Sequence, residues 1–441
     1  MRTSPSSCSI PGALPLVGHL PWLRWRPLQF VESQRTLAPV TAFMLRRRPA
    51  YLVNEPDLVW RLLTEHSGQL GRGRSGDKTR ALTGNGLGSS DGDFHKQQRR
   101  LIQPVFHQDQ VASRVTALRR AVEQRTGRWT EGESMDLVQQ MLAVSAAGVL
   151  TTLFDEPSPE GMAQDISLAL PTCLDTASRR AFAMLALPRA SDRRYTAALG
   201  RLHAIANKLA EQGTAAAAGA NLNLLGRLRE AQKVRLPGVD DDQVHDEIMT
   251  MLVAGVETVA TTVCWTFHLL NKHPDSVVRV HNELERVLGG RPLEANDIPE
   301  LVQLRRVVRE ALRLFPPVWL VRRRAAARLH MGGQDIPVGA SVYFSPYSLH
   351  RDPRWFQEPE RFRPDRWHPE VERTLPRGAY LPFGAGVHRC VGEAFAMTEV
   401  MTILATVLQG WEITSASPRV RAKAVVTLRP HRMPVAVRHR R

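Results

Sequence analysis

A run of 23 residues, Ile248 to Leu270, is long enough and apolar enough to cross a bilayer as a helix. Its centre carries an acid, Glu257, and a charge there costs about 2.5–3.5 kcal/mol on insertion scales. Five threonines and His268 add polarity, and no basic cluster flanks the run. A helix that is apolar all round is otherwise the buried centre of a large domain, and we expect that arrangement.

The helix that contains this run has clear end signals. Asp240, Asp241 and Asp242 supply capping acids before it, and Pro274 ends it. A helix of about thirty residues is about 45 Å long, enough to cross the whole molecule. Helical periodicity covers residues 94–315, whereas short strand-like runs and glycine turns mark the first hundred residues and the stretch after residue 325. The sequence predicts a mainly α fold with a small β portion.

Nothing in the chain divides it into parts. No internal repeat or long linker is visible, so we expect a single domain over residues 1–441, in which 1–20 form a proline-rich N-terminal segment. Prolines at positions 5, 11, 15 and 21 interrupt any apolar stretch of signal or anchor length there. The four cysteines are scattered without paired spacing, which excludes a disulfide framework and fits a reducing compartment. These features predict a cytoplasmic protein without a membrane anchor.

The chain is strongly basic, with a formal net charge of +16. Six of its 59 basic residues are lysines and the rest are arginines, a skew typical of a GC-rich genome. A positive surface also suits an acidic partner. Because no zinc-finger spacing or aromatic RNA-binding motif accompanies the basic runs, we expect no nucleic-acid binding.

One cysteine lies in an unusual place, the glycine-rich stretch LPFGAGVHRCVGEAF from Leu381 to Phe395. A zinc site needs about four ligands at fixed spacings, and Cys390 has no second cysteine pair near it. Spacing alone leaves a catalytic Cys/His pair open. The glycines permit unusual backbone angles, so that backbone N–H groups can point at a thiolate. Such a thiolate suits an axial ligand of haem iron.

The stretch from Phe383 to Gly392 resembles the haem-binding loop of cytochrome P450 enzymes. The pattern consists of a Phe, two glycines, the cysteine and a final glycine; Phe383, Gly384, Cys390 and Gly392 occupy its positions. The segment AGVET, from Ala254 to Thr258, is similar to the family's motif in the long helix. There the resemblance implies that Thr258 gates oxygen and protons and that Glu257 relays protons.

Further landmarks follow in the family's order. The resemblance implies that His95, Arg99, Arg323 and His388 contact the haem propionates. Many members have Arg in place of His388, so we expect a weaker contact there that depends on pH. It also implies a buried structural ion-pair triad, whose members are Glu310, Arg313 and Arg361.

The resemblance implies reductive activation of O2 on haem b (iron protoporphyrin IX) and insertion of one oxygen atom into a C–H bond. Electrons would come from NAD(P)H through a separate ferredoxin and ferredoxin reductase, because no reductase is fused to the chain. Some basic residues near the thiolate face would touch that partner; the candidates are Arg99, Arg100, Arg377 and Arg389. A peroxide-driven enzyme typically lacks the Glu-Thr pair, so we discount it. A haem-binding sensor or carrier without turnover is an alternative of another class.

The substrate pocket is expected to be apolar. Its expected lining is Val253, Ala254, Val318, Leu320 and residues around 165–190, including the segment MLALP. A lipophilic ligand suits such a lining. Segments such as PPVWLVRRRA and VTLRP resemble actinomycete enzymes that oxidise sesquiterpenes and related natural products. A polyketide or peptide intermediate, including C–C or C–S bond formation on it, remains the alternative.

Overall fold

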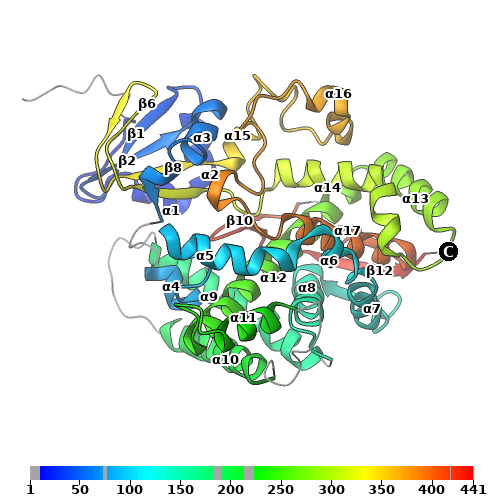
Figure 1. The fold of residues 1–441 in the computed structure, drawn as a ribbon. Helices are drawn as coiled ribbons and strands as arrows, with labels where there is room; N and C mark the ends of the chain where they lie inside the picture. The colour runs from blue at the N-terminus through cyan, green and yellow to red at the C-terminus, as the bar shows by residue number, and fades with distance from the viewer. Residues whose placement is uncertain are drawn as a thin grey trace, which may run out of the picture.

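The structure is a computed structural model that describes residues 10–72, 77–157, 159–181, 191–212, 223–417 and 419–440 (Figure 1). Its α-helices are α1 (Leu20–Trp25), α2 (Pro27–Gln34), α3 (Pro56–Leu63), α4 (Asp77–Thr83), α5 (Gly92–Ile102), α6 (Gln108–Ala112), α7 (Val115–Thr126), α8 (Leu137–Leu153), α9 (Glu160–Ala181), α10 (Ser191–Gln212), α11 (Leu224–Lys233), α12 (Asp241–Lys272), α13 (Pro274–Leu288), α14 (Val302–Leu314), α15 (Pro346–Leu349), α16 (Pro369–Glu372) and α17 (Glu393–Gly410).

The strands are short and form a minor part of the molecule. They are β1 (Val40–Leu45), β2 (Arg48–Val53), β3 (Leu70–Gly71), β4 (Ser134–Asp136), β5 (Val321–Ala325), β6 (Leu329–Met331), β7 (Gln334–Ile336), β8 (Ser341–Phe344), β9 (Trp411–Ser415), β10 (Ala422–Ala424), β11 (Leu428–Pro430) and β12 (Pro434–His439). The predicted mainly α fold with a small β portion is confirmed.

Helix α12 is the central element, as its sequence predicts. The Asp240 side chain accepts a hydrogen bond from the Gln243 N–H and so caps its first turn, and Pro274 begins the next helix. Helices α8, α10, α14 and α17 all pack against it (Figure 1). Among the described residues, α12 is the one helix long and apolar enough to cross a membrane, but 78% of its most apolar window is buried inside the fold. The apolar run is therefore the core helix of this domain.

The largest sheet joins the two halves of the chain. Its strand order is β1-β2-β8-β5-β3, and the β2–β8 pair is parallel, with Ala50 opposite Ser341. Short strand β3 pairs with β5, so that Gly71 lies opposite Arg324. Most of this sheet lies beside the helical body, at the upper left of Figure 1. These pairings bring residues near position 72 next to residues near position 323.

Candidate active site

The cysteine loop precedes α17 and depends on two glycines in left-handed backbone conformations. Gly384 has φ 70° and Gly386 has φ 68°. A Cβ added at Gly386 would lie 1.9 Å from the carbonyl oxygen of Leu63, at the end of α3, so no side chain fits there. The backbone N–H of Cys390 donates to the carbonyl oxygen of Phe383 at 2.9 Å. Glycine is thus required at Gly384 by conformation and at Gly386 by conformation and space.

The Cys390 side chain is accessible, whereas Cys173 and Cys264, the other free cysteines in the described part of the chain, are buried. Surrounding protein still desolvates the sulfur and raises the pKa of the Cys390 thiol; a hydrogen bond from the Gly392 backbone and the charges of Arg99 and Arg389 oppose that rise. These are the groups that would stabilise a thiolate. The accessible sulfur can therefore reach a ligand that the two buried cysteines cannot.

Helix α5 supports the loop from one side. Arg99 donates from Nη1 to the Arg389 carbonyl oxygen at 2.6 Å and to the Val387 carbonyl oxygen at 3.4 Å. His95 is buried, and its Nε2 lies 3.3 Å from the same Val387 oxygen. The rings of His95 and His388 have centroids 4.3 Å apart. The i, i+4 spacing of His95 and Arg99 thus places both on the loop backbone, as one helix face allows.

Arginines from the β3–β5 pair complete a concentration of positive charge. Arg72 Nη2 lies 3.3 Å from His388 Nδ1, and the Arg72 backbone N–H donates to Asp91 at 2.6 Å. Burial, then the charge of Arg72, lowers the pKa of Arg323 to about 10. Burial and four neighbouring bases lower the pKa of His388 to about 2, so its ring is uncharged near neutral pH. Because propionates would add negative charge beside this ring, the pH dependence of the His388 contact stays a prediction.

These basic side chains, with Asp91, form what we call the open cluster; its members are Arg72, His95, Arg323, His388 and Asp91. The buried Arg72 Nε has no hydrogen-bond partner, nor has Asp91 Oδ1. Asp91 is the acid that faces these bases, and its Oδ1 lies 3.7 Å from His388 Nε2. Burying several bases around one acid is unfavourable unless further anions join them. The open cluster therefore fits a ligand with carboxylates, such as the two propionates of haem.

Mid-way along α12, the helix presents an accessible face. Ala254 is exposed, and Val253 and Thr258 are partly buried, although residues on both sides of them are buried. The Thr258 hydroxyl donates to the Ala254 carbonyl oxygen at 2.7 Å, which leaves its oxygen lone pairs facing outward from the helix. Gly255 packs closely on α8, because a Cβ there would lie 3.0 Å from Val149. A ligand can thus reach Thr258 in the middle of an otherwise buried helix.

Glu257, next in sequence, is turned away into the core. Its Oε1 accepts from the Thr427 hydroxyl at 2.9 Å and lies 3.1 Å from Arg429 Nε, while Oε2 has no hydrogen-bond partner. The Arg429–Glu257 contact is an ion pair without hydrogen-bond alignment, and Arg429 also pairs with Asp175 on α9 at 2.8 Å. Burial raises the pKa of Glu257 to about 7, although Arg429 and Thr427 pull it down. The sequence did not reveal Thr427 and Arg429 as its partners.

The structural ion-pair prediction was right about two residues and wrong about the third. Glu310 and Arg313 are fully buried and form a two-pronged pair, with both distances 2.8 Å. Arg361, however, has a side chain that is 71% exposed and pairs with Glu358. Only the Arg361 carbonyl oxygen reaches the site, where it accepts from Arg313 Nη2 at 3.1 Å.

Arg366 takes the place predicted for Arg361. Its Nε lies 3.2 Å from Glu310 Oε1, and the Trp367 indole N–H donates to Glu310 Oε2 at 3.1 Å. We call Glu310, Arg313, Arg366 and Trp367 the paired cluster. The 3-10 turn Pro364–Trp367 directs both side chains inward, whereas Arg361 lies in the irregular chain before it.

The structure describes some, but not all, of the residues predicted to line the pocket. Val318 is exposed by 40% and Leu320 is partly buried, on the segment between α14 and β5. The Leu428 N–H donates to the Pro317 carbonyl oxygen at 2.9 Å, which places this segment beside the strand that carries Arg429. Helix α9 covers the described part of the 165–190 region, and the segment MLALP lies outside the described residues. The lining of the pocket stays a prediction.

Comparisons with known proteins agree with this geometry. The family model for Cytochrome P450 matches residues 9–431. Cyclooctatin synthase of Streptomyces melanosporofaciens is 36% identical over 96% of this chain and 94% of its own length. Pentalenene oxygenase of Streptomyces avermitilis is 32% identical over 92% of this chain and 90% of its own length.

A solved structure shows the same fold. The crystal structure of the cytochrome P450DA heme domain superposes with a TM-score of 0.84 at 24% identity, over 98% of this chain and 97% of that one. The chain belongs to the cytochrome P450 family and is a monooxygenase of that family.

Proposed function

We propose that this monooxygenase binds haem between the Cys390 loop and α12, and oxidises a lipophilic terpene-type intermediate. The family implies haem. The observation that carries the placement is the open cluster, in which basic side chains from α5, β5 and the cysteine loop converge with one facing acid. Cys390 is the accessible thiol beside that cluster, so we assign it as the residue that would bind the haem iron.

Different residues would hold different parts of the haem. Cys390 would ligate the iron, while Arg72, Arg323, His95 and His388 would bind the propionates. Arg99 holds the loop carbonyls at 2.6 and 3.4 Å and lends positive charge to the thiolate. Phe383 and Gly384 shape the loop, and Gly392 supplies the backbone N–H that faces the sulfur. Bound haem supplies the reductive activation of O2 and the transfer of one oxygen atom to a C–H bond.

Thr258 and Glu257 serve proton delivery. Thr258 presents its hydroxyl oxygen on the accessible face of α12, where it can accept a proton from water and pass one on. Glu257 has a pKa of about 7, which lets its carboxyl hold or release a proton near neutral pH. Because Glu257 is buried against Thr427 and Arg429, it acts through a change of side-chain position or an intervening water rather than by direct contact.

The substrate class rests on the relatives. The names of cyclooctat-9-en-7-ol 5-monooxygenase and pentalenene oxygenase identify terpenoid substrates, and both relatives are similar over nine-tenths of this chain. The accessible apolar residues Val253, Ala254, Val318 and Leu320 suit such a ligand. Electrons from NAD(P)H would pass through a ferredoxin and its reductase in the cytoplasm, and the exposed Arg389 would help to dock the acidic ferredoxin.

The assignment is tested first by spectroscopy. The reduced, haem-loaded protein should show the red-shifted Soret band of thiolate ligation in the presence of CO. The Cys390→Ala variant should lose that band, and the Cys173→Ala variant should keep it. A wild-type protein without the band would contradict the role of Cys390.

The substrate is tested by titration. Cyclic diterpene and sesquiterpene alcohols and hydrocarbons should shift the haem iron from low to high spin, and incubation with ferredoxin, reductase and NAD(P)H should yield products heavier by one oxygen. A spin shift and product with polyketide or peptide intermediates alone would reject the terpene assignment and leave the haem-thiolate assignment intact.

A further inference from the structure

Large apolar side chains are exposed unevenly over the molecule. Among the described residues, three of the four exposed leucines and two of the three exposed tryptophans fall between positions 14 and 37. Leu16 and Trp25 are the most open of these, with 66% and 67% of the residue surface exposed. Single exposed apolar residues are common on proteins, but a group that contains two tryptophans marks an interaction site.

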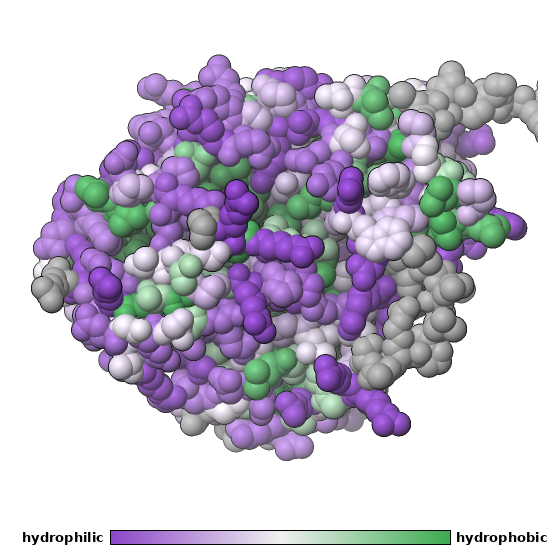
Figure 2. All heavy atoms as spheres, turned by 180° about the vertical axis from the view of Figure 1, so that it is seen from behind, coloured by the Kyte–Doolittle hydropathy of each residue, from purple (hydrophilic) through white to green (hydrophobic). Residues whose placement is uncertain are grey.

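These side chains lie on neighbouring elements. The chain from Leu14 to Gly18 forms a tight turn, whose Val17 carbonyl oxygen accepts from the Arg46 N–H at 3.1 Å. The turn therefore lies against the β1–β2 turn, and α1 follows it directly. Helix α1 buries Leu20 and Leu23 and presents Trp22 and Trp25 outward. Figure 2, which views the molecule from behind, shows green, apolar residues among purple ones at the right-hand side.

The same surface is rich in arginine. Arg24 and Arg26 on and beside α1 are exposed, as are Arg46, Arg47 and Arg48 in the β1–β2 turn. Residues 10–50 contain six arginines but a single acid, Glu32. We call the surface formed by the turn at 14–18, by α1 and by residues 46–48 the N-terminal face. It combines apolar side chains with a concentrated positive charge.

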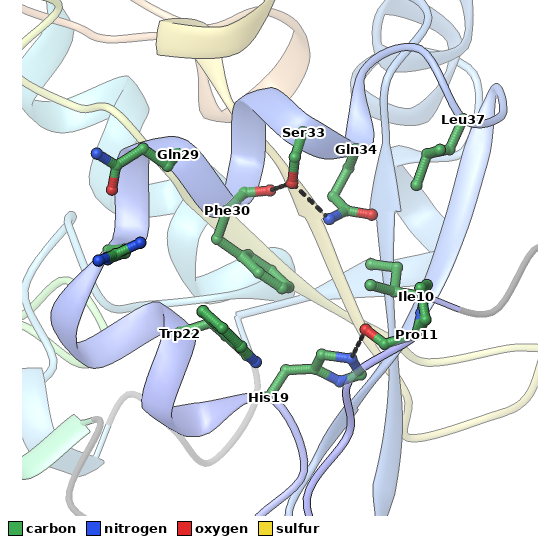
Figure 3. Close-up of a pocket in the computed structure, with 10 residues that line it drawn as sticks. Ile10, Pro11, His19, Trp22, Gln29, Phe30, Ser33, Gln34 and Leu37 are labelled. Atoms are coloured by element: carbon green, nitrogen blue, oxygen red, sulfur yellow. Dashed lines mark hydrogen bonds between the residues drawn. The ribbon is translucent and has the colours of Figure 1, made fainter.

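A groove of about 390 Å³ opens on this face beside Trp22 (Figure 3). Ile10, Phe30 and Leu37 contribute apolar lining, and Arg26 also lines the groove. Trp22 is held across the groove by its indole N–H, which donates to the Gly12 carbonyl oxygen at 3.3 Å. The groove offers an apolar recess that adjoins exposed indole and guanidinium groups.

We propose that the N-terminal face binds the surface of an anionic lipid bilayer. Tryptophan side chains favour the boundary between lipid head groups and acyl chains, and arginines are attracted to anionic lipid head groups. The groove accepts part of an apolar chain next to Trp22. The contact is peripheral, since α12 is buried and does not span a membrane in this fold.

Charge distinguishes a bilayer from a second copy of this chain as the occupant. A two-fold dimer formed through this face would bring the five exposed arginines of one copy against the same five of the other. Such like charges repel, whereas an anionic bilayer neutralises them. The proposal goes beyond the proposed function, because it depends neither on haem ligation nor on the substrate.

The test uses the haem-loaded full chain and vesicles of equal parts phosphatidylglycerol and phosphatidylcholine. We expect the protein to sediment with these vesicles at low salt, to dissociate as salt rises, and to bind pure phosphatidylcholine at least about tenfold more weakly. Arg47→Glu/Arg48→Glu should weaken binding by about tenfold or more. Brominated lipids should quench tryptophan fluorescence in the wild type.

The double variant Trp22→Ala/Trp25→Ala should remove most of that quenching. Trp25→Ala alone, which alters a mostly exposed side chain, should remove part of it. Trp355→Ala, which alters an exposed tryptophan elsewhere, is the matched control and should leave binding and quenching unchanged. A far-UV circular dichroism spectrum and a thermal midpoint like those of the wild type show that each variant has folded.

Three results would overturn the proposal. They are absence of vesicle binding at low salt, equal binding by the wild type and both multiple variants, and association of the protein with itself through Trp22 and Trp25 in the absence of lipid.

Discussion

The protein contains two clusters of buried or partly buried bases that differ in how their charges are satisfied. In the paired cluster, Glu310 accepts from Arg313 through both carboxylate oxygens and also binds Arg366 and Trp367. In the open cluster, Asp91 faces several bases, and Arg72 Nε has no partner. The first arrangement is complete within the chain and suits a scaffold. The second needs an anion from outside, which suits a binding site.

The largest effect that would sharpen this comparison is expected at Glu310. Glu310→Gln leaves the fully buried Arg313 without its counter-charge, and breaking a buried pair in this way costs about 3–5 kcal/mol. Chemical denaturation of the variant should show this loss whether or not haem is bound. A loss confined to the haem-bound state would mean that the paired cluster belongs to the binding site.

Glu257 is intermediate between the two clusters in how its charge is satisfied. One of its carboxylate oxygens has a hydrogen-bond partner and the other has none. Its pKa rises from 4.5 to about 7 on folding, so the folded protein retains a proton there that the unfolded chain has lost. Its contribution to stability is therefore greatest below pH 4.5 and falls, by about 3 kcal/mol in all, as pH rises to about 7.

Glu257→Gln should flatten that decline. Denaturation curves between pH 5 and pH 8 would measure it, and Glu247→Gln, which alters another buried acid of α12 with a pKa of about 7, should flatten the decline to a similar extent. An unchanged pH profile in Glu257→Gln would show that Arg429 keeps this carboxyl ionised.

The open cluster predicts opposite effects on haem affinity and on the stability of the haem-free chain. On the proposed assignment Arg72→Ala removes a charge-assisted contact to a propionate, worth about 1.5–3 kcal/mol, and should weaken haem binding by about ten- to a hundredfold. It also relieves repulsion with Arg323, so the haem-free chain should unfold no more easily than the wild type. Haem transfer to apomyoglobin and denaturation of the haem-free form measure the two quantities. A less stable haem-free variant would place Arg72 with the paired cluster.

The smallest effect concerns Arg366, the arginine that takes the place predicted for Arg361. Arg366→Ala should destabilise the protein by about 1–3 kcal/mol, because it removes a hydrogen bond to buried Glu310. Arg361→Ala should stay within about 0.5 kcal/mol of the wild type, since its side chain is exposed. Thermal unfolding of the two variants side by side decides between them. The reverse order would restore the original prediction.

The sequence predicted the structure well where a residue type at a given position has only one structural explanation. The apolar run around Glu257 predicted a buried central helix, and the glycines at 384 and 386 predicted a backbone that only glycine adopts easily. The sequence could not choose between Arg361 and Arg366, because arginines recur in the segment RFRPDRW without any periodicity. Whether each points inward depends on a single 3-10 turn.

Arg72 was missed for a related reason. In a chain whose basic residues are almost all arginines, one more arginine carries no information by itself. Its position beside Arg323 follows from the pairing of Gly71 with Arg324, a contact between residues far apart in the sequence. The partners of Glu257, Thr427 and Arg429, lie in the last part of the chain and came together with α12 only in the folded structure.

The contact between Gly386 and the Leu63 carbonyl oxygen has a consequence for the order of assembly during synthesis. The cysteine loop takes its shape against the end of α3, so an early part of the chain must wait for nearly the whole chain to be made. During synthesis on the ribosome, α3 is made long before the cysteine loop that packs against its end. The loop can therefore take its final shape only late in synthesis, once residues 383–390 have been made.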